Sequence, residues 1–170
     1  LYENRLINFC YVGALSNTSW HTIDELYFLY KYLRQICKSK LNIITTSNHQ
    51  DIKNKFLEFE NEIEITSTKS INELKNILKN VDIGLLPYRK QNTFPENLIG
   101  ETMLGTKTVE YICSGIPVLV NNLCGGASEI VKNNDFGLTY NPFTYEEITI
   151  ESINFLVNKK IDLEKAKDLF

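Results

Sequence analysis

This 170-residue sequence has few of the residues that several classes of protein require. It contains three arginines, two histidines, four cysteines and one methionine, and its net charge is −3. A net negative charge argues against a nucleic-acid-binding protein. The longest apolar runs, within residues 81–88 and 115–120, are far shorter than the roughly 20 residues of a membrane-spanning helix.

The cysteines and histidines show no metal-binding or redox pattern. No two of the four cysteines are spaced as a Cys-x-x-Cys pair. Because Cys10, Cys37 and Cys113 lie in apolar segments, we expect reduced and mostly buried thiols, as in a cytoplasmic protein. His21 and His49 have no second His or Cys at metal-ligand spacing, so we expect no metal site.

The length and composition predict one folded domain. Hydrophobic residues make up 43% of the chain and charged residues 23%, as in ordinary globular proteins. A chain of this size can build a core of its own. The only methionine is Met103, and nothing near Leu1 resembles the remnant of a signal peptide. We therefore expect a single domain, residues 1–170, that is a fragment of a larger protein.

Short apolar segments alternate along the chain with amphipathic ones. The short segments predict strands at 7–15, 41–46, 62–66, 81–88, 116–121 and 136–140. Apolar spacing, with capping boxes at Thr22–Glu25, Ser70–Glu73 and Thr144–Glu147, predicts helices at 22–39, 49–59, 70–80, 106–114, 126–133 and 144–158, and another beginning in 162–170. This alternation predicts an α/β fold, with a doubly wound, mostly parallel, six-stranded Rossmann-like sheet and helices on both faces.

Residues 89–105 have no clear hydrophobic period and are expected to form a long loop. A loop of this length inside a compact domain is usually functional. It follows the predicted strand 81–88, and in open α/β sheets ligands bind at the carboxyl ends of the strands. Its position therefore indicates where a site would lie.

Several familiar motifs are missing. Gly13 is the only glycine left of a Gly-x-Gly-x-x-Gly dinucleotide fingerprint, and no Gly-x-x-x-x-Gly-Lys-Ser/Thr phosphate loop occurs. The hydroxyl residues 66–68 end the third strand where a phosphoacceptor receiver domain would have Asp. No Asp-x-Asp pair follows an apolar strand, and no Gly-x-Ser-x-Gly elbow is present, which argues against a metal-held nucleotide and a serine hydrolase.

The segment after this loop predicts a short helix whose N-terminus can bind an anion. Gly105 would let the backbone approach a ligand, and Thr106 is a candidate N-cap. Lys107 adds a full positive charge to the helix N-terminus, a combination that suits a diphosphate. Glu110, one turn further, could accept hydrogen bonds from the paired hydroxyls of a ribose.

A solvated helix face for Glu110 and a simple surface charge for Lys107 are the alternatives. The neighbours Val109 and 111–113 make the helix apolar nearly all round, and a glutamate is seldom buried without a partner. We therefore favour a binding role for Glu110.

Residues 81–140 resemble the C-terminal, nucleotide-sugar-binding half of family 4 (group 1) glycosyltransferases, which have two Rossmann domains in the GT-B architecture. The matching pieces are VDIGLLPY (81–88), TKTVEY (106–111), SGIPVLV (114–120), GGASEIV (125–131) and FGL (136–138). The opening YVGAL (11–15), followed by Trp20, is similar to the first strand of that half.

The resemblance implies a hexosyltransferase-type enzyme that moves a sugar from a nucleoside-diphosphate sugar to a saccharide or lipid-linked acceptor. It implies retention of anomeric configuration, no catalytic metal or other cofactor, and a part in polysaccharide biosynthesis. It also implies a protein that is cytoplasmic or peripheral to the inner membrane, with no membrane span and no nucleic-acid partner. The acceptor-binding N-terminal domain would be absent from this chain, so we expect the fragment alone to be inactive.

The resemblance also implies roles for donor-binding residues. Glu110 matches the second of two glutamates separated by seven residues in the family motif and would hold the ribose. The first glutamate falls at Thr102, where Glu101 is the adjacent carboxylate. Gly13 would clear space for the diphosphate, or simply form a turn. It begins Gly-Ala-Leu, where many relatives have Gly-Arg-Leu, and no lysine follows in the first loop. The family's pyrophosphate clamp is therefore missing, and Lys107, Arg89 or the helix N-terminus would have to replace it.

Other residues keep two interpretations each. Thr68 follows the third strand, where relatives hold the base, or belongs to a plain turn. Trp20 and His21 form either a hydrophobic staple with a solvent-facing histidine or a wall of the donor cleft. Gly125 and Gly126 are expected to allow close packing at a helix start. For the whole chain, the alternatives are a non-catalytic scaffold domain of the same fold and half of a nucleotide-sugar epimerase.

Overall fold

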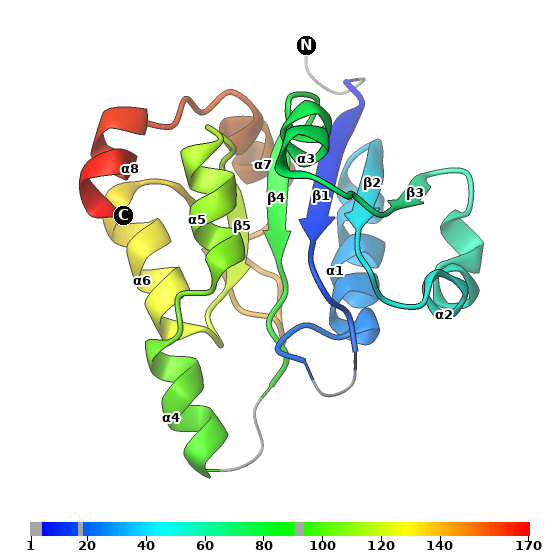
Figure 1. The fold of residues 1–170 in the computed structure, drawn as a ribbon, viewed down its shortest axis with the longest axis horizontal. Coiled ribbons are helices and arrows are strands. Elements are labelled where there is room, and N and C mark those ends of the chain that lie inside the picture. The colour runs from blue at the N-terminus through cyan, green and yellow to red at the C-terminus, as the bar shows by residue number, and fades with distance from the viewer. Residues whose placement is uncertain (1–4, 17–18, 91–93) are drawn as a thin grey trace.

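The computed structural model describes residues 5–16, 19–90 and 94–170 (Figure 1). In this part of the chain six strands form one parallel sheet in the order β3-β2-β1-β4-β5-β6. The strands are β1 (Ile7–Val12), β2 (Ser39–Ile44), β3 (Ile63–Thr66), β4 (Ile83–Leu86), β5 (Val118–Asn121) and β6 (Gly137–Tyr140). The predicted six-stranded, doubly wound fold is confirmed.

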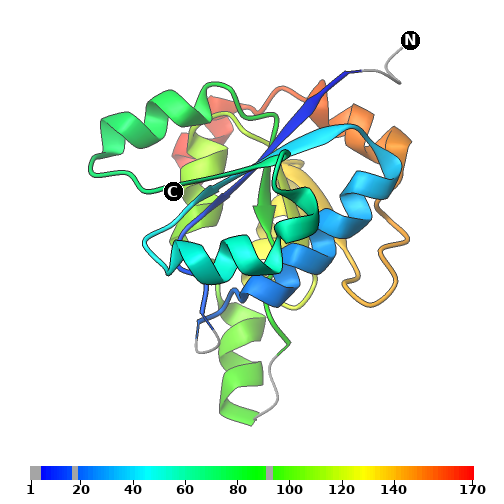
Figure 2. The ribbon, with the colours of Figure 1, turned by 90° about the vertical axis from the view of Figure 1, so that its right-hand side faces the viewer.

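Helices cover both faces of this sheet (Figures 1 and 2). They are α1 (Ile23–Ile36), α2 (His49–Lys55), α3 (Ile71–Leu78), α4 (Phe94–Thr102), α5 (Thr106–Cys113), α6 (Gly125–Asn134), α7 (Ile150–Val157) and α8 (Leu163–Leu169), with a 3-10 turn at Leu57–Phe59. Helices α1, α2 and α7 pack on one face, and α3, α5, α6 and α8 lie on the other.

Successive side chains of β1 enter two separate cores. Phe9 and Tyr11 pack with α1, α2 and α7, whereas Cys10 packs with α3, α5 and α6. All three side chains are fully buried. A strand buried on both faces needs apolar residues at every position, which explains the continuous apolar runs in the sequence.

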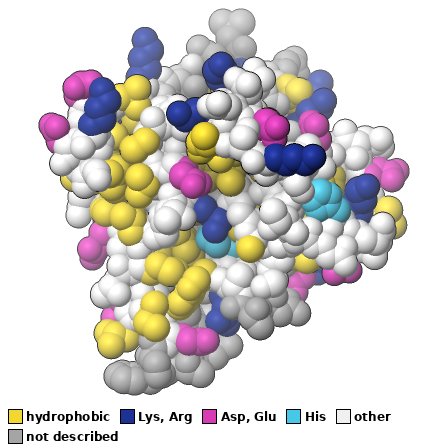
Figure 3. Space-filling view, in the orientation of Figure 1, with side chains coloured by type: hydrophobic (Ala, Val, Ile, Leu, Met, Phe, Trp, Pro, Cys, Tyr) yellow, Lys and Arg dark blue, Asp and Glu magenta, His cyan; other side chains and the backbone are white. Residues whose placement is uncertain are grey.

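The predicted loop 89–105 is wrong, because most of it forms α4. This helix projects from the carboxyl edge of the sheet, the edge toward which the arrowheads of β1 and β4 point in Figure 1. Leu98 and Ile99 of α4 are each more than half exposed. On the face shown in Figure 3, hydrophobic side chains gather over this part of the molecule. The C-terminal end of α4 is the part that packs on α6. The sequence of α4 therefore has no continuous stripe of buried apolar residues that would predict a helix.

The helix predicted at 144–158 begins only at Ile150. Thr149 is its N-cap and exchanges hydrogen bonds with Ser152 in a capping box. The predicted box at Thr144–Glu147 is wrong, because the Glu147 carboxylate instead accepts the Asn141 amide at 2.9 Å. The N-caps predicted at Thr22 and Ser70 are confirmed, because each hydroxyl accepts the third-position amide at 3.2 Å. In neither does the glutamate make the return bond of a capping box: Glu25 accepts the Thr22 hydroxyl at 3.2 Å, and Glu73 accepts the Lys69 amide at 2.8 Å.

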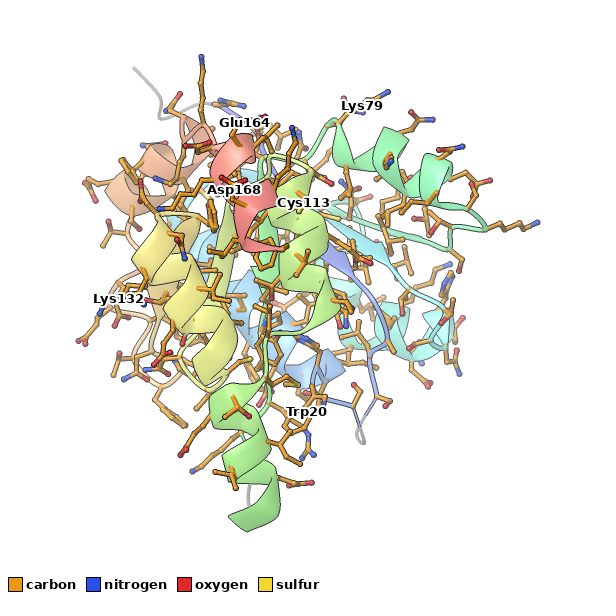
Figure 4. All side chains as sticks on the ribbon, turned by 60° about the vertical axis from the view of Figure 1, so that its left-hand side comes forward. Trp20, Lys79, Cys113, Lys132, Glu164 and Asp168 are labelled. Carbon is orange, nitrogen blue, oxygen red and sulfur yellow. The ribbon has the colours of Figure 1, made fainter. Side chains whose placement is uncertain are left out.

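The four cysteines are free thiols, but they are not all buried. Cys10 and Cys124 are buried, Cys37 is half-buried and Cys113 is exposed. Cys113 ends α5 at its far end from Trp20, as Figure 4 shows. The outer side of α5 therefore faces solvent, and the expectation of a helix that is apolar nearly all round is wrong.

Helix α5 lies close to the sheet because Gly84 of β4 has no side chain. A Cβ atom on Gly84 would lie 2.7 Å from Cγ and Cδ2 of Tyr111. The buried Tyr111 ring fills this space, and its hydroxyl donates to the carbonyl oxygen of Cys10 at 3.0 Å. One side chain of α5 is thereby anchored to both β1 and β4.

We expect Gly84→Ala to lower the free energy of unfolding by about 1–3 kcal/mol, because the added methyl overpacks a ring that cannot move away. Urea unfolding of the two proteins would measure the difference. In a Tyr111→Leu background the same alanine should cost much less, since the ring is gone. An equal cost in both backgrounds would contradict the proposed clash.

Candidate functional site

The candidate site lies at the carboxyl edge of the sheet, where β1 and β4 end and α5 begins. Parallel strands β1 and β4 are neighbours in the sheet, so the segments that follow them leave from the same edge. The connection from α4 to α5 returns to this edge, which places the first turn of α5 above it (Figure 1). Residues about 90 positions apart in the sequence meet here.

The Lys107 side chain lies across Gly13. Gly13 has a φ of 128°, a backbone conformation that side-chain-bearing residues rarely adopt. A Cβ atom built on Gly13 would clash with Cε of Lys107 and would lie 2.6 Å from its Nζ. The backbone conformation therefore favours glycine at this position, and a side chain there would displace the flexible end of Lys107. The space that Gly13 was expected to clear for a ligand is occupied by the Lys107 stem.

Lys107 is a partly desolvated cation at this edge. Its burial lowers the pKa of the ammonium group, and the nearby Glu110 carboxylate opposes that shift. A cation that has lost part of its hydration gains more from an anionic ligand than a fully solvated one. This makes Lys107 the side chain best placed here to meet a negative charge.

Glu110 lies one turn along α5 and is exposed. The expectation that apolar neighbours enclose it is wrong, because the side of α5 that carries Glu110 and Cys113 faces solvent. Its carboxylate is nevertheless close enough to Lys107 to affect the lysine pKa. The structure thus brings together the cation and the carboxylate that the sequence analysis singled out.

Gly105, and not Thr106, is the N-cap of α5. Gly105 has a φ of 72°, and a Cβ atom there would lie 2.5 Å from the Tyr88 hydroxyl oxygen. That hydroxyl donates to the Leu104 carbonyl at 3.3 Å. Because glycine has no side-chain acceptor, no side chain caps the first amides of α5. This helix N-terminus carries a partial positive charge beside Lys107.

His21 is buried at the base of the site, so the expectation of a solvent-facing histidine is wrong. Its side chain is 3% exposed and lies against the rings of Tyr11 and Tyr88, with centroid distances of 5.4 and 4.3 Å. Its Nδ1 lies 3.2 Å from the Pro87 carbonyl oxygen. A carbonyl can only accept, so Nδ1 carries the proton and Nε2 keeps a lone pair.

Burial and, to a lesser extent, the nearby Lys107 charge lower the pKa of His21 to about 3, against the opposing effect of the bond to Pro87. His21 is therefore neutral at physiological pH. The neutral ring lets the cation of Lys107 lie close to it without repulsion.

All three arginines are paired with carboxylates. Arg89 lies 3.1 Å from Glu96 of α4, with its guanidinium 5.8 Å from the centre of the Trp20 ring. Arg5 pairs with Asp82 and Arg34 with Glu62, both at 2.5 Å. Arg5 precedes β1 and Arg34 ends α1, so these two lie at the amino edge of the sheet. Arg89 is the arginine at the carboxyl edge, where Figure 4 shows Trp20 at the end of the molecule from which α4 projects.

Thr102 and Thr68 lie at the borders of the site. Thr102 ends α4, where its hydroxyl donates to the carbonyls of Leu98 and Ile99 at 3.3 and 3.2 Å. Thr68 is half-buried and follows β3, two strands away from β1 in the sheet order. Within the described part of the chain, neither threonine forms a hydrogen bond with Lys107.

The close packing expected at Gly125 and Gly126 is confirmed. A Cβ atom on Gly125 would collide with the carbonyl of Glu101, and one on Gly126 would lie 2.6 Å from the carbonyl of Thr102. The Ala127 amide donates to the Met103 carbonyl at 3.0 Å. These contacts dock the end of α4 onto α6. They join segments more than 20 residues apart, so a local sequence pattern could not reveal them.

Two further features of the described residues bear on function. None of their His, Cys, Asp and Glu side chains forms a group of three or more that could hold a metal ion. Among the helices in 5–16, 19–90 and 94–170, none is both long enough and apolar enough to cross a membrane.

Comparisons with known proteins agree with the fold. A sequence profile described as "Glycosyl transferases group 1" matches residues 7–158. No curated protein sequence matches the chain significantly. Solved structures do match across nearly the whole chain, at identities that establish only the fold.

Three of these structures are named here. WaaG, a glycosyltransferase involved in lipopolysaccharide biosynthesis, is 18% identical with a TM-score of 0.60, over 97% of this chain and 42% of WaaG. The lipopolysaccharide outer core galactosyltransferase WaaB is 18% identical with a TM-score of 0.63, over 94% and 42%. Sucrose-phosphate synthase from Thermosynechococcus elongatus is 16% identical with a TM-score of 0.68, over 96% and 41%. The chain thus spans about two fifths of the length of these proteins.

We expect the buried neutral His21 to make stability depend on pH. The unfolded chain gains a proton at His21 near pH 6.5, whereas the folded chain gains it only near pH 3. The unfolded state therefore binds more protons between these values, and stability falls as the pH falls through this window, by up to about 1.4 kcal/mol per pH unit. Urea unfolding at a series of pH values would measure this slope.

His21→Asn keeps a donor for the Pro87 carbonyl but does not titrate. The slope of this variant between pH 6.5 and 4 should be shallower than that of the unchanged protein. The carboxylates titrate in both proteins and cancel in the comparison. Parallel slopes would show that His21 is protonated in the folded state, contrary to its burial.

Proposed function

This chain belongs to the group 1 glycosyltransferase family, and from that premise we propose that it is the donor-binding half of a retaining glycosyltransferase. The complete enzyme would move a sugar from a nucleoside-diphosphate sugar to a saccharide or lipid-linked acceptor, without a metal or other cofactor. The acceptor would be held mainly by an N-terminal domain outside this chain. The proposal extends to a hexosyltransferase that acts in polysaccharide biosynthesis, in the cytoplasm or at the inner face of a membrane.

The position of Lys107 is the observation that carries this proposal. Its partly buried ammonium group lies over Gly13, beside the uncapped N-terminus of α5 and at the carboxyl edge of the sheet. Ligands of doubly wound folds bind at this edge, and phosphates favour helix N-termini. Glu110 follows one turn later, where its exposed carboxylate is free to accept the hydroxyls of a ribose.

These groups suit the step that such an enzyme must accelerate. When the bond between the sugar C1 and the phosphate oxygen breaks, negative charge develops on the departing diphosphate. A cation and helix amides that are already in place stabilise that charge in the transition state more than in the bound donor. Lys107 would supply the positive charge that arginine supplies in the family's pyrophosphate clamp, since Arg5 and Arg34 lie at the opposite, amino edge of the sheet.

The names of the similar structures fit an acceptor of carbohydrate type. Two of them are named for lipopolysaccharide synthesis and one for sucrose-phosphate synthesis. The names of the three describe the transfer of a sugar or the synthesis of sucrose phosphate. For this chain, a saccharide acceptor is therefore the simplest proposal.

We expect calorimetry to detect binding of uridine, guanosine or cytidine diphosphate to this chain. Lys107→Met should weaken that binding by about 1.5–3 kcal/mol, the scale of a hydrogen bond to a charged group. Glu110→Ala should weaken it by a similar amount, because the ribose hydroxyls lose a charged acceptor. Both side chains are at least partly exposed, so the variants should remain folded.

Lys79→Met and Glu164→Ala are matched controls, because they make the same chemical changes on α3 and α8, away from the site (Figure 4). Both should bind the diphosphate as the unchanged chain does. Equal affinity in the Lys107→Met variant would remove Lys107 from the site. If none of the three diphosphates binds at millimolar concentration, the scaffold alternative gains instead.

A further inference from the structure

A second hollow lies on the other face of the sheet from Lys107. It has a volume of about 510 Å³ and is bounded by α1, the ends of β5 and β6, and the segment between β6 and α7. In Figure 2 the orange segment after β6 lies on the same side of the sheet as the blue helix α1. Its size falls within the range of about 300–1,000 Å³ that is typical of ligand pockets. We call it the aromatic groove, after its lining residues Phe28, Tyr32, Tyr140, Phe143 and Tyr145.

The inner wall of the aromatic groove is a stack of three tyrosine rings. Tyr32 and Tyr145 stack at a centroid distance of 4.8 Å, and Tyr140 and Tyr145 at 5.7 Å, each pair with an interplanar angle of 18°. The Tyr32 hydroxyl donates to the Ile148 carbonyl at 3.3 Å, which fixes the outermost ring. The groove therefore has a wall that is formed before any ligand arrives.

The backbone at Tyr145 is strained to complete this stack. Its φ of 55° is in the left-handed region, which a tyrosine adopts only at a cost of about 1–3 kcal/mol. Strain of this kind persists where the surrounding structure demands it, and it is concentrated at functional sites. Together with the cavity, it indicates that the position of this ring matters.

The mouth of the groove exposes two more aromatic rings and several polar groups. Phe28 and Phe143 are 53% and 66% exposed, and Lys90 Nζ lies 5.3 Å from the centre of the Phe143 ring. The side chains of Glu25 and Gln35 also line the groove. Within the described part of the chain the Gln35 side-chain amide forms no hydrogen bond, so this group can serve a ligand.

This mixture of surfaces matches the chemistry of a saccharide. A pyranose ring has an apolar face of C–H groups, which stacks on an aromatic ring, and a rim of hydroxyls, which needs amide, ammonium and carboxylate partners. A lipid chain would leave Glu25, Gln35 and Lys90 facing hydrocarbon without partners, at an energetic cost. A groove that interleaves rings with polar side chains favours a sugar chain over a purely apolar occupant.

The groove and the Lys107 site share the exit of β4. Pro87 lines the groove, while its carbonyl accepts a hydrogen bond from His21 on the side of the Lys107 site. Three residues further on, Lys90 stands at the mouth of the groove. A ligand in the groove would therefore lie across one strand exit from a donor bound at Lys107.

We infer that the aromatic groove binds the saccharide chain of the acceptor, so that this half of the enzyme holds acceptor as well as donor. The inference rests on the proposed function, because only that function makes a bound saccharide the acceptor. The binding test below does not depend on the proposed function. The groove would hold sugar units adjacent to the one that receives the transferred sugar. Phe143 supplies the exposed stacking surface, and the tyrosine wall supplies the rigid side.

The test uses the full 170-residue chain labelled with nitrogen-15 and titrated with defined trisaccharides of glucose, galactose, mannose and N-acetylglucosamine. At least one trisaccharide should shift the amide resonances of Asn141, of residues 143–145 and of α1. Phe143→Ala should weaken that binding about tenfold, the scale of one lost aromatic contact. Phe143 is exposed, so the variant should keep its fold.

Phe155→Ala is the matched control. Phe155 is 61% exposed and has Lys159 Nζ 4.8 Å from its ring centre, as Phe143 has Lys90, but it lies outside the groove. This control should bind the trisaccharide unchanged, and both variants should bind uridine diphosphate as the unchanged chain does.

Four results would overturn the inference. No trisaccharide shifts the groove resonances, or the shifts centre on Lys107 and Glu110 instead, or Phe143→Ala binds as tightly as the unchanged chain. Concentration-dependent shifts at the groove without any sugar would mean that a second copy of the chain occupies it, which also overturns the inference. If the trisaccharide binds but none of the diphosphates does, the proposed function is contradicted and saccharide binding at the groove is not.

Discussion

The fit of the Tyr111 ring over Gly84 is the contact on which the geometry of the site depends. Helix α5 can approach the sheet only where β4 presents no side chain, and the ring fills that gap. The hydroxyl bond to Cys10 then ties the helix to the neighbouring strand. Because α5 is rigid, its first turn is thereby held over the end of β1. Lys107 reaches Gly13 from this position, and Glu110 stands one turn behind it.

Electrostatics at the carboxyl edge depend on very few groups. Arg5 and Arg34 are used at the amino edge, and Arg89 is held by Glu96 and Trp20. Lys107 is left as a cation that has lost water without gaining a close ion pair. A neutral His21 beneath it avoids repulsion, and an uncapped helix N-terminus adds to its field. A ligand with two phosphates would offset the desolvation of the Lys107 ammonium group and accept hydrogen bonds from the first amides of α5.

The exit of β4 links the two faces of the sheet. The Pro87 carbonyl accepts from His21, and the Tyr88 carbonyl accepts from the Asn121 side chain at 2.7 Å. The Arg89 amide donates to the Trp20 carbonyl at 2.8 Å. Three successive residues are thus fixed by partners from two other segments, residues 20–21 and the end of β5. A rigid strand exit of this kind can separate a donor on one side from an acceptor on the other without letting either site drift.

The sequence by itself determined the sheet, the positions of most helices and the family. Strand and helix periods and the caps at Thr22 and Ser70 depend on residues within a few positions of each other, so they can be read locally. The donor-binding role of Lys107 and Glu110 was predicted from their place at a helix start and stays a prediction. The tertiary structure alone decided that Lys107 lies over Gly13, because that contact joins residues about 90 positions apart.

Other outcomes were decided in the same way. Helix α4 forms where no period predicted it, because its end docks on Gly125 and Gly126 of α6. His21 is buried because two tyrosines from other segments enclose it. In both cases the deciding contact comes from outside the local window, where a sequence pattern carries no record of its partner. The start of α7 at Ile150 differs, because it depends on nearby residues: Thr149 and Ser152 form the capping box, and the Glu147 carboxylate accepts the Asn141 amide six residues earlier.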